Sequence, residues 1–430
     1  MPSIETILSQ MSSVAKPQRK FLLTLLNALM YLPSRVNFRN LGRYTDCNEK
    51  TFSRWFSRPF DFLAFNLLIL KDVLHGNGER IAAIDASFVP KSGRKSHGLD
   101  WFWSGSQGRT QRGQELSLLA MVDVTYNTAY ALSASQTPAL PRSTCKGQSQ
   151  PTKAVATTTK TRHKAKHTPF VGPPLPTRID SYLGHLQHHI KALLGCGIRY
   201  LVADSFYAKT KFVSGVGELN LHLISKLRQD ADLRWLYVGA QKPKGRHRQY
   251  SGKVSFDDLS RFERVGELDG QRVYTATVNS PAFKRTLRIV YLVREDNGKT
   301  ASALLFSTDT DCPALDILRY YKARFQIEFL FRDAKQHTGL CDCQATRKEK
   351  LDFHFNASLT ALNLLRLQDR QQNLKAGGNG RRVISIASGK IRQFNAHLLE
   401  RFSRHLKLDF SAIKSSQAFA DLCNYGAIAA

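Results

Sequence analysis

Hydrophobic residues near the start of the chain recur with the period of an α-helix. Leu22, Leu25 and Leu29 follow one another at spacings of three or four residues, and Phe21 extends the same stripe. At about 3.6 residues per turn these side chains share one helix face. We therefore expect a helical N-terminal unit over residues 1–75.

A segment within this unit has the pattern of a helix-turn-helix. Residues 38–44 are amphipathic, a polar turn follows, and Phe52 and Phe56 then lie on one side of a second short helix. Asp46 and Glu49 are placed as a capping box where this second helix begins.

The opposite face of the second helix carries Lys50, Ser53 and Arg54. These residue types contact base edges or phosphates, so we expect them on the recognition helix of a DNA-binding domain. A plain amphipathic helix with a solvated polar face explains the segment equally well.

After a glycine-rich break at 75–78, short apolar runs typical of strands alternate with helical patterns. Strands are expected at 80–89, in a hairpin over 116–133 that turns at 126–128, at 199–204 and at 221–227, with helices at 180–194 and from about 207. Residues 135–177 contain no acidic residue and few large apolar groups, which predicts a disordered basic insertion. It would contact DNA without reading sequence, or serve as an inert tether.

The second half begins with a strand-rich pattern over 231–307, with a turn at Asp269 and Gly270. One long helix is then expected from Pro313 to about His337, and the tail is helical in pattern. The chain is thus predicted to be a multidomain α/β protein.

The charge of the chain changes this picture toward a nucleic-acid partner. Lys and Arg number 63 against 34 Asp and Glu, which gives a formal net charge of +29 and a pI near 10. Such a surface favours a polyanion. The apolar runs are too short to span a bilayer, and the N-terminus lacks the pattern of a secretory signal, so a cytoplasmic protein is expected.

The seven cysteines are scattered and odd in number, unlike a disulfide framework. Cys341 and Cys343 lie near His337, but no second pair is present to complete a zinc site. Reduced thiols are therefore expected.

Two acidic residues interrupt apolar strands. Asp85 lies within Ile-Ala-Ala-Ile-Asp-Ala-Ser-Phe, and Asp204 ends Tyr-Leu-Val-Ala-Asp. A carboxylate in such a place is usually paired, hydrogen-bonded or bound to a metal ion. For Asp204, capping of the following helix is an equally good explanation.

A third acid comes from the helix after Pro313. At 100° per residue, Glu328 shares a stripe about 60° wide with Tyr321, Arg324 and Lys335. Three carboxylates can hold two Mg²⁺ ions for phosphodiester chemistry, and the cations would hold phosphates. The structural alternative is an amphipathic helix in which Arg324 pairs with Glu328 at i, i+4.

The spacing of Tyr321, Arg324, Glu328 and Lys335 resembles the Y-R-E-K signature of the insertion-sequence DDE transposases, in the insertion sequence four-like group. The basic loop over 90–96 is also similar to that of related members. The resemblance covers about residues 80–366 and is only architectural for the N-terminal part.

This resemblance implies an RNase H-like mixed sheet flanked by helices, with a β-rich insertion and an N-terminal helical DNA-binding domain. It implies that Asp85, Asp204 and Glu328 bind two Mg²⁺ ions, for which Mn²⁺ can substitute. Water would cut double-stranded DNA at the element's inverted repeats, and the freed 3′-OH would attack target DNA in cut-and-paste transposition by a homodimer. The phosphate contacts would come from Tyr321, Arg324, Lys335, Lys91, Arg94 and Lys95.

The expected organisation follows from the pattern and the resemblance together. The units are a DNA-binding domain at 1–75, a catalytic core at 79–134 and 178–230, the insertion at 135–177, a β-rich subdomain at 231–307, the Glu-bearing part of the core at 308–370, and a helical region suited to dimerisation at 371–430.

Two other functions fit the same residues. An inactive or domesticated DNA-binding protein would lose an acid, whereas all three are present. An RNase H-like nuclease without strand transfer is the other, and the Y-R-E-K stripe argues weakly against it.

The tryptophans give a further expectation. Trp235 lies near the start of the β-rich segment and has no assignable role. Trp101 and Trp103 are expected to form a partly buried structural pair rather than a base-stacking surface.

Overall fold

The computed structural model describes residues 3–74, 76, 78–105, 107–140, 176–296, 299–375 and 385–428. Most of the expected insertion, at 141–175, and the glycine-rich basic loop at 376–384 lie outside the described residues. The described parts form a mixed α/β structure in which one large sheet is flanked by helices, as expected. Among them, no helix combines the length and the apolar character needed to cross a membrane.

The N-terminal unit is helical, as the apolar period predicts. It contains α1 (Ile4–Gln10), α2 (Lys16–Tyr31), α3 (Phe38–Tyr44), α4 (Glu49–Trp55), α5 (Phe62–Ile69) and α6 (Lys71–Leu74). Phe52 and Phe56 are buried, as expected for the inner face of α4. The predicted capping box is wrong: Asn48 caps α4, and its side chain accepts a hydrogen bond from the Thr51 N–H at 2.9 Å. Asn48 stands directly before the first helical residue, where a capping side chain reaches the free N–H groups best.

Five strands form the part of the sheet that carries the two aspartates. They are β1 (Arg80–Pro90), β3 (Arg109–Asp123), β4 (Thr128–Gln136), β5 (Tyr200–Val202) and β6 (His222–Leu227), in the spatial order β4-β3-β1-β5-β6. β3 runs antiparallel to its two neighbours β1 and β4, β5 runs parallel to β1, and β6 runs parallel to β5. This is an RNase H-like arrangement, and a short strand, β2 (Asp100–Ser104), pairs with the start of β3.

The β3–β4 hairpin turns where the sequence predicts. Asn127 adopts φ of 51°, a left-handed conformation that asparagine tolerates. Both strands are longer than expected, and β4 continues to Gln136, so the sheet extends past the predicted start of the insertion at 135.

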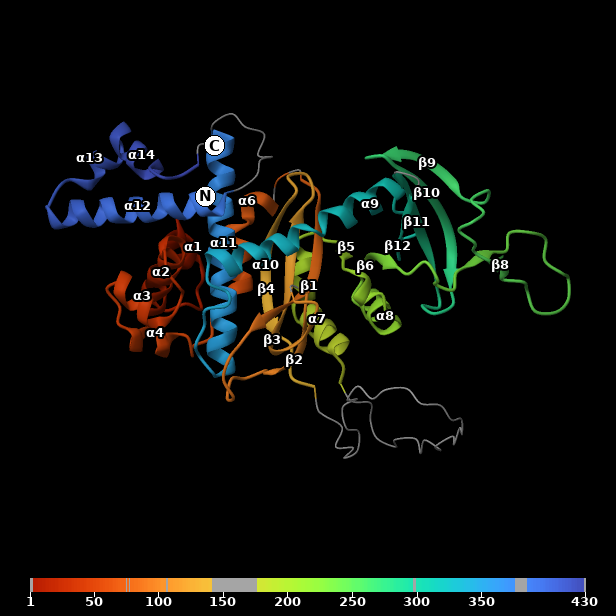
Figure 1. Cartoon of the computed structure of the whole chain (residues 1–430), viewed down its shortest axis with the longest axis horizontal. Helices are drawn as coiled ribbons and strands as arrows, with labels where there is room; N and C mark the ends of the chain where they lie inside the picture. Colours follow the sequence, from red (N-terminus) through yellow and green to blue (C-terminus); the bar gives the residue numbers. More distant parts are fainter. Residues whose placement is uncertain are drawn as a thin grey trace, which may run out of the picture.

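Helices cover both faces of this sheet (Figure 1). On one face lies α7 (Arg178–Gly195), whose His185 Nδ1 is 3.0 Å from the Ser117 Oγ of β3. A short 3₁₀ turn, η1 (Ser205–Tyr207), and α8 (Thr210–Glu218) follow β5. On the other face lie α9 (Ala314–Ala323), α10 (Gln326–His337) and α11 (Lys348–Lys375).

The strand-rich second half extends the same sheet. It contains β7 (Arg234–Leu236), β8 (Tyr250–Lys253), β9 (Glu263–Leu268), β10 (Gln271–Ser280), β11 (Arg285–Asp296) and β12 (Lys299–Ser307). The turn between β9 and β10 falls at Asp269 and Gly270, which have φ of 53° and 69°. Because β12 pairs antiparallel with β6, the segment is hydrogen-bonded directly to the core.

The single long helix expected after Pro313 is wrong, because the structure has two helices that meet at Arg324 and Phe325. At this junction the N–H groups of Phe325, Ile327 and Glu328 bond to carbonyls three residues back instead of four. The tighter turn interrupts the α-helical ladder without reversing its direction.

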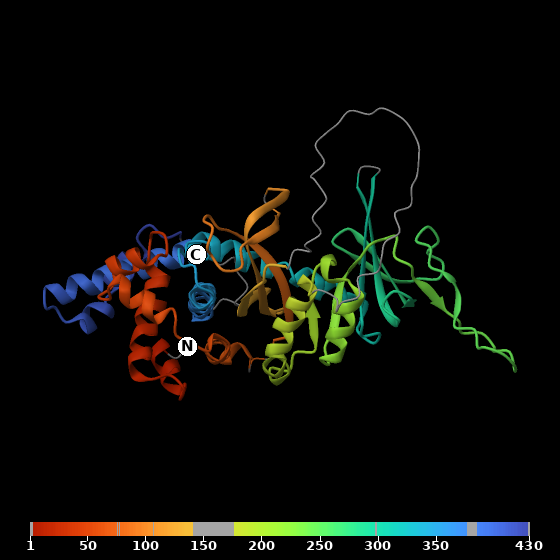
Figure 2. The ribbon, with the colours of Figure 1, turned by 90° about the horizontal axis from the view of Figure 1, so that it is seen from below.

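Helix α11 packs against the core sheet on one side and the N-terminal unit on the other. The side chain of Phe353 in α11 lies against Phe56 and Phe62 of the N-terminal unit, with ring centroids 4.7 and 5.1 Å apart. The C-terminal helices α12 (Ile386–His405), α13 (Phe410–Lys414) and α14 (Gln417–Asn424) lie beside this unit, where Tyr31 stacks on His397 at 3.9 Å. Both views place these helices at one end of the molecule and β9–β12 at the other, with the core sheet between them (Figure 2).

Candidate active site

Asp85 and Asp204 meet because of the register between two parallel strands. Ala82 and Ala83 of β1 pair with Leu201 and Val202 of β5. Continuing this register by two residues places Asp85 level with Asp204. Asp85 of β1 and Asp204, two residues past the end of β5, therefore lie at the same height although more than a hundred residues separate them in sequence.

Asp204 is held in this place by its own hydrogen bonds. Its Oδ1 accepts from the Phe206 N–H at 2.9 Å, so it does cap the short turn that follows. Its backbone carbonyl accepts from the Ser225 hydroxyl at 2.7 Å. Capping and membership of an acidic site are thus compatible, because one carboxylate oxygen remains for another partner.

The junction of α9 and α10 brings Arg324 and Glu328 over the two aspartates. Arg324 Nη2 donates to Glu328 Oε1 at 2.8 Å, and Arg324 Nη1 lies 3.8 Å from Asp85 Oδ2. The i, i+4 pair expected as the structural alternative is therefore present. The Arg324 guanidinium therefore lies between Glu328 of α10 and Asp85 of β1.

The charge balance of this group is unusual. Burial and the neighbouring Asp204 raise the pKa of Asp85 to about 7. Burial also raises the pKa of Asp204. Carboxylic acids respond in this way when they are removed from water without enough positive charge nearby. A further cation bound beside Asp85 and Asp204 would therefore stabilise their ionised forms.

The donor set fits a divalent metal ion in chemistry, although Glu328 must turn to complete it. Carboxylate oxygens are the ligands that Mg²⁺ prefers. In the part of the chain that the structure describes, no three His, Cys, Asp or Glu side chains are grouped closely enough to hold one ion. Because Glu328 is bonded to Arg324 and partly exposed, rotation of its side chain is the change that would bring it to the aspartates.

Tyr321 and Lys335 lie on the same side of the sheet as the acids, as the helical stripe predicts, but they are differently engaged. The Arg324 guanidinium is 5.6 Å from the centre of the Tyr321 ring, and burial raises the pKa of this phenol. Lys335 Nζ donates to Ser87 Oγ and to the Phe88 carbonyl, both at 2.9 Å. In this structure Lys335 ties α10 to β1.

The three basic residues of the loop after β1 also differ in whether they contact the rest of the protein. Lys91 donates to the Cys343 carbonyl, whereas Arg94 and Lys95 are exposed. Lys91 must therefore break its bond to the protein before it reaches a phosphate, whereas Arg94 and Lys95 form no such bond to the described residues.

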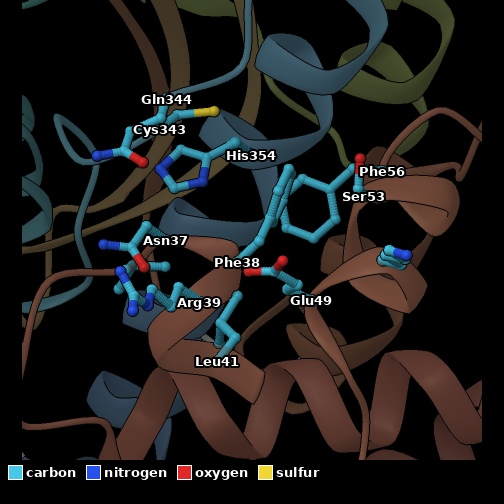
Figure 3. A pocket seen from close by; sticks show the side chains of 12 residues that line it. Asn37, Phe38, Arg39, Leu41, Glu49, Ser53, Phe56, Cys343, Gln344 and His354 are labelled. Atoms are coloured by element: carbon cyan, nitrogen blue, oxygen red, sulfur yellow. The ribbon is translucent and has the colours of Figure 1, made fainter. Parts of the chain in front are cut away.

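Two of the three residues expected on the recognition helix line the pocket drawn in Figure 3. Lys50 and Ser53 of α4 line it together with Asn37, Gln344 and His354, and its volume is about 400 Å³. The Ser53 hydroxyl accepts a hydrogen bond from Lys350 of α11 at 2.6 Å. Arg54 is exposed. The polar face of α4 is therefore shared between the protein and solvent.

Sequence reasoning missed Tyr207, which packs against Tyr182 and Phe212 and is close enough to both aspartates to feel their charge. Its side chain is buried, its hydroxyl has no hydrogen-bond partner among the described residues, and burial together with Asp85 and Asp204 raises its pKa. An aromatic residue just after Asp204 gave no signal in the sequence, because core packing explains it equally well.

The expectation for two tryptophans is wrong. Trp101 and Trp103 are 54% and 58% exposed rather than partly buried. Trp235 is 8% exposed and packs on Phe262, with ring centroids 5.2 Å apart. It therefore belongs to the core of the β-rich half.

A comparison with protein families gives one match. The model of a family described as DDE superfamily endonuclease matches residues 10–280, which is more than half of the chain. The match includes Asp85 and Asp204 and ends before α9, so Glu328 lies outside it. A search of curated proteins found no match.

Proposed function

Because the chain belongs to the DDE superfamily of endonucleases, we propose that it is a metal-dependent transposase that moves an insertion sequence by cut-and-paste transposition. The observation that carries this proposal is the position of Asp85 on β1 level with Asp204, just past the end of the parallel strand β5, with Glu328 of α10 bonded to the arginine beside Asp85. The Y-R-E-K spacing around Glu328 favours a transposase over a simple nuclease.

The three acids have distinct supports in this proposal. Asp85 and Asp204 are fixed by strands, while Glu328 is on a helix and exchanges its bond to Arg324 for a place beside them. Two Mg²⁺ ions, or Mn²⁺ in their place, would activate the attacking oxygen and stabilise the leaving one. Once released from Glu328, the Arg324 guanidinium is free to grip a phosphate with two parallel hydrogen bonds.

The remaining polar residues bind and orient the DNA. Tyr321 donates its phenolic hydrogen to a phosphate oxygen, because burial keeps that group protonated. Arg94 and Lys95 contact the backbone beside the site, joined by Lys335 and Lys91 when the DNA displaces their protein partners. Water attacks at the element's end, and the 3′-OH so formed attacks the target duplex.

Double-stranded DNA with inverted repeats is the proposed substrate, and two copies of the chain act on its two ends. Lys50, Ser53 and Arg54 would read the repeat. The C-terminal region at 386–428 is proposed as the dimer contact because it exposes large apolar side chains, which usually mark an interface. These side chains are Leu398, Phe402, Leu406, Leu408, Leu422, Tyr425 and Ile428.

Cleavage of end-bearing DNA tests the proposal. With Mg²⁺ or Mn²⁺ the protein should cut at the inverted repeats that flank its own gene and join the freed 3′ end to a second duplex. Glu328→Gln should bind these ends and not cut them. The exposed Glu349→Gln is the matched control and should cut normally.

Undiminished cleavage by Glu328→Gln would remove this residue from the site. Cutting without joining would identify an RNase H-like nuclease, and binding without cutting by the unaltered chain would identify an inactive DNA-binding protein.

A further inference from the structure

Two tryptophans stand exposed beside one another on β2. Trp101 and Trp103 alternate with Phe102, which is fully buried, so both indoles are on the outward face of the strand. The other two tryptophans of the chain are packed, Trp55 against Phe21 and Trp235 against Phe262. A pair of exposed indoles is unusual for a surface that meets only water.

The strand register places these indoles on the face of the sheet that carries Asp85. Trp101 pairs with Arg112 of β3, and Asp85 pairs with Leu118. Residues directly opposite in antiparallel strands share a face, and residues an even number apart along one strand share it too. Arg112 and Leu118 are an even number apart, so the indoles and the carboxylate lie on one side.

A basic groove lies between the end of β1 and the β2–β3 hairpin, residues 100–113, which carries the two exposed tryptophans. It has a volume of about 620 Å³, and its cations are Lys91, Arg109 and Arg112. Of the described residues that line it, none is acidic. Arg109 and Arg112 are exposed, so their charge is available to a ligand. The groove therefore combines an aromatic surface with positive charge.

The hairpin is held in place before any ligand arrives. Arg178 of α7 donates to the Trp101 carbonyl at 3.0 Å and lies 4.7 Å over the Phe102 ring. At Gly113 the strand passes so close to β1 that an added Cβ would lie 2.4 Å from the Phe88 ring. A preformed surface loses little conformational freedom on binding.

The groove is within reach of a DNA strand that lies at the acids. Arg112, which lines it, is six residues along β3 from Leu118, the partner of Asp85, and these six residues span about 20 Å at roughly 3.3 Å per residue. One DNA strand advances about 3.4 Å per nucleotide in a duplex. A strand with a phosphate at Asp85 thus reaches the groove after about six nucleotides.

We propose that Trp101 and Trp103 form a stacking site for unpaired bases of the DNA strand whose phosphate lies at Asp85, Asp204 and Glu328, with Arg109 and Arg112 holding its backbone. This inference rests on the proposed function and adds the state of the substrate, which is locally unpaired. Bases inside a duplex are covered by their neighbours, so an indole can stack only on one that has left the helix. Stacking tolerates any base, whereas the cations bind any phosphate.

Binding without metal ions tests this site separately from cleavage. The full chain in EDTA is titrated with a labelled blunt duplex and with the same duplex carrying a short single-stranded extension, and fluorescence anisotropy gives each Kd. Trp101→Ala and Trp103→Ala should weaken binding of the extended duplex by about 5-fold or more each, as expected for a lost base stack. Binding of the blunt duplex should change less than twofold.

Three controls define the contact. Trp101→Phe should retain most of the affinity, since a phenyl ring also stacks. Leu315→Ala, which truncates an exposed apolar residue of α9, should have no effect. A duplex whose extension is made of abasic nucleotides should bind the unaltered protein as weakly as the normal extended duplex binds Trp101→Ala. With this abasic duplex, Trp101→Ala should cause no further loss of affinity.

Two results would overturn the inference: unchanged binding of the extended duplex in both alanine variants, or equal losses for blunt and extended duplexes. Thermal unfolding of each variant must match that of the unaltered chain, and if Trp101→Ala unfolds early, Trp101→Gln replaces it. Because no metal is present, loss of this result leaves the cleavage test untouched, and failure to cleave leaves this result untouched.

Discussion

Asp85 keeps an acidic side chain among apolar neighbours, at the point where β1 passes Asp204 and α10. Burial is the main reason that its pKa rises to about 7, and the charge of Asp204 adds to it. Arg324, 3.8 Å away, compensates only in part, because its shorter bond goes to Glu328. An acid in this condition opposes folding when it is ionised.

The pH dependence of stability should report this directly. The folded-state pKa of Asp85 is about 7 against an ordinary value of 3.8. Between these values the folded chain retains a proton that the unfolded chain has lost, so stability falls as pH rises from about 4 to about 7. In metal-free protein at pH 8, Asp85→Asn should therefore raise the free energy of unfolding by about 1–4 kcal/mol.

Urea unfolding at several pH values makes this measurement. The gap between Asp85→Asn and the unaltered chain should close near pH 4, where both side chains are neutral. The exposed Asp257→Asn serves as the control and should follow the unaltered chain at every pH. A gap that does not depend on pH would mean that the effect is steric.

A divalent cation should stabilise the unaltered chain more than it stabilises variants that lack one of these carboxylates. Ca²⁺ or Mg²⁺ bound only by the folded site should raise the Tm of the unaltered chain in proportion to the logarithm of its concentration. Asp85→Asn and Glu328→Gln should show a much smaller rise, measured by calorimetry. Equal rises in all three proteins would place the ion elsewhere.

At the scale of elements, the position of Glu328 depends on how α10 is fastened. Arg366 of α11 donates to Asp333 of α10 at 2.9 Å and to the Ala129 carbonyl of β4 at 2.7 Å, and all of this is buried. Arg332 pairs with the same Asp333 at 2.8 Å from a half-exposed position. The two arginines therefore bind the same carboxylate, Arg366 from a buried position and Arg332 from a half-exposed one.

Removing each arginine should separate these contributions. Arg366→Met should lower the free energy of unfolding by about 3–5 kcal/mol, because it leaves Asp333 buried without its main partner. Arg332→Met should cost less than about 1 kcal/mol. Urea denaturation measures both, and similar costs would show that burial does not control the pair.

The strands and helices themselves followed largely from hydrophobic period, since burial on one face leaves a direct record in the sequence. The hairpin that turns at Asn127 and the strand carrying Asp85 were predictable for this reason. The break at Arg324 and Phe325 was not, because the tighter turn preserves the same apolar face. The N-cap of α4 at Asn48 was not predicted either, because Asp46 and Glu49 also have the spacing of a capping box.

The candidate site was predictable in its residues and less so in its contacts. Asp85 and Asp204 stood out because acids rarely interrupt apolar strands. The bond of Lys335 to Ser87 and Phe88 depends on elements far apart in sequence, which no local pattern records. The exposure of Trp101 likewise depends on whether another element covers β2, and alternation along a strand cannot reveal that.

At the scale of the whole molecule, the N-terminal unit shares its core with α11. The sequence predicts a domain over residues 1–75. Phe353 nevertheless lies among Phe21, Phe56 and Phe62, with centroid distances of 6.4, 4.7 and 5.1 Å. The apolar face of the unit is therefore completed by α11, the helix that follows α10.

A fragment of residues 1–75 should accordingly fail to fold by itself. Its circular dichroism should show little helix and no cooperative thermal transition, because the face that meets α11 would be open to water. In the full chain, Phe353→Ala should lower the free energy of unfolding by about 3–5 kcal/mol. A fragment with a sharp transition would show that the unit is independent.

The place of Phe353 also bears on the order in which a newly made chain acquires its abilities. A ribosome adds about 5–20 residues per second, so α11 emerges on the order of half a minute after the N-terminal helices. Until then α4 lacks the packing that Phe353 supplies, and Glu328 has only just been added. If the proposed roles of α4 and Glu328 hold, the chain becomes able to bind DNA and to cut it at nearly the same moment.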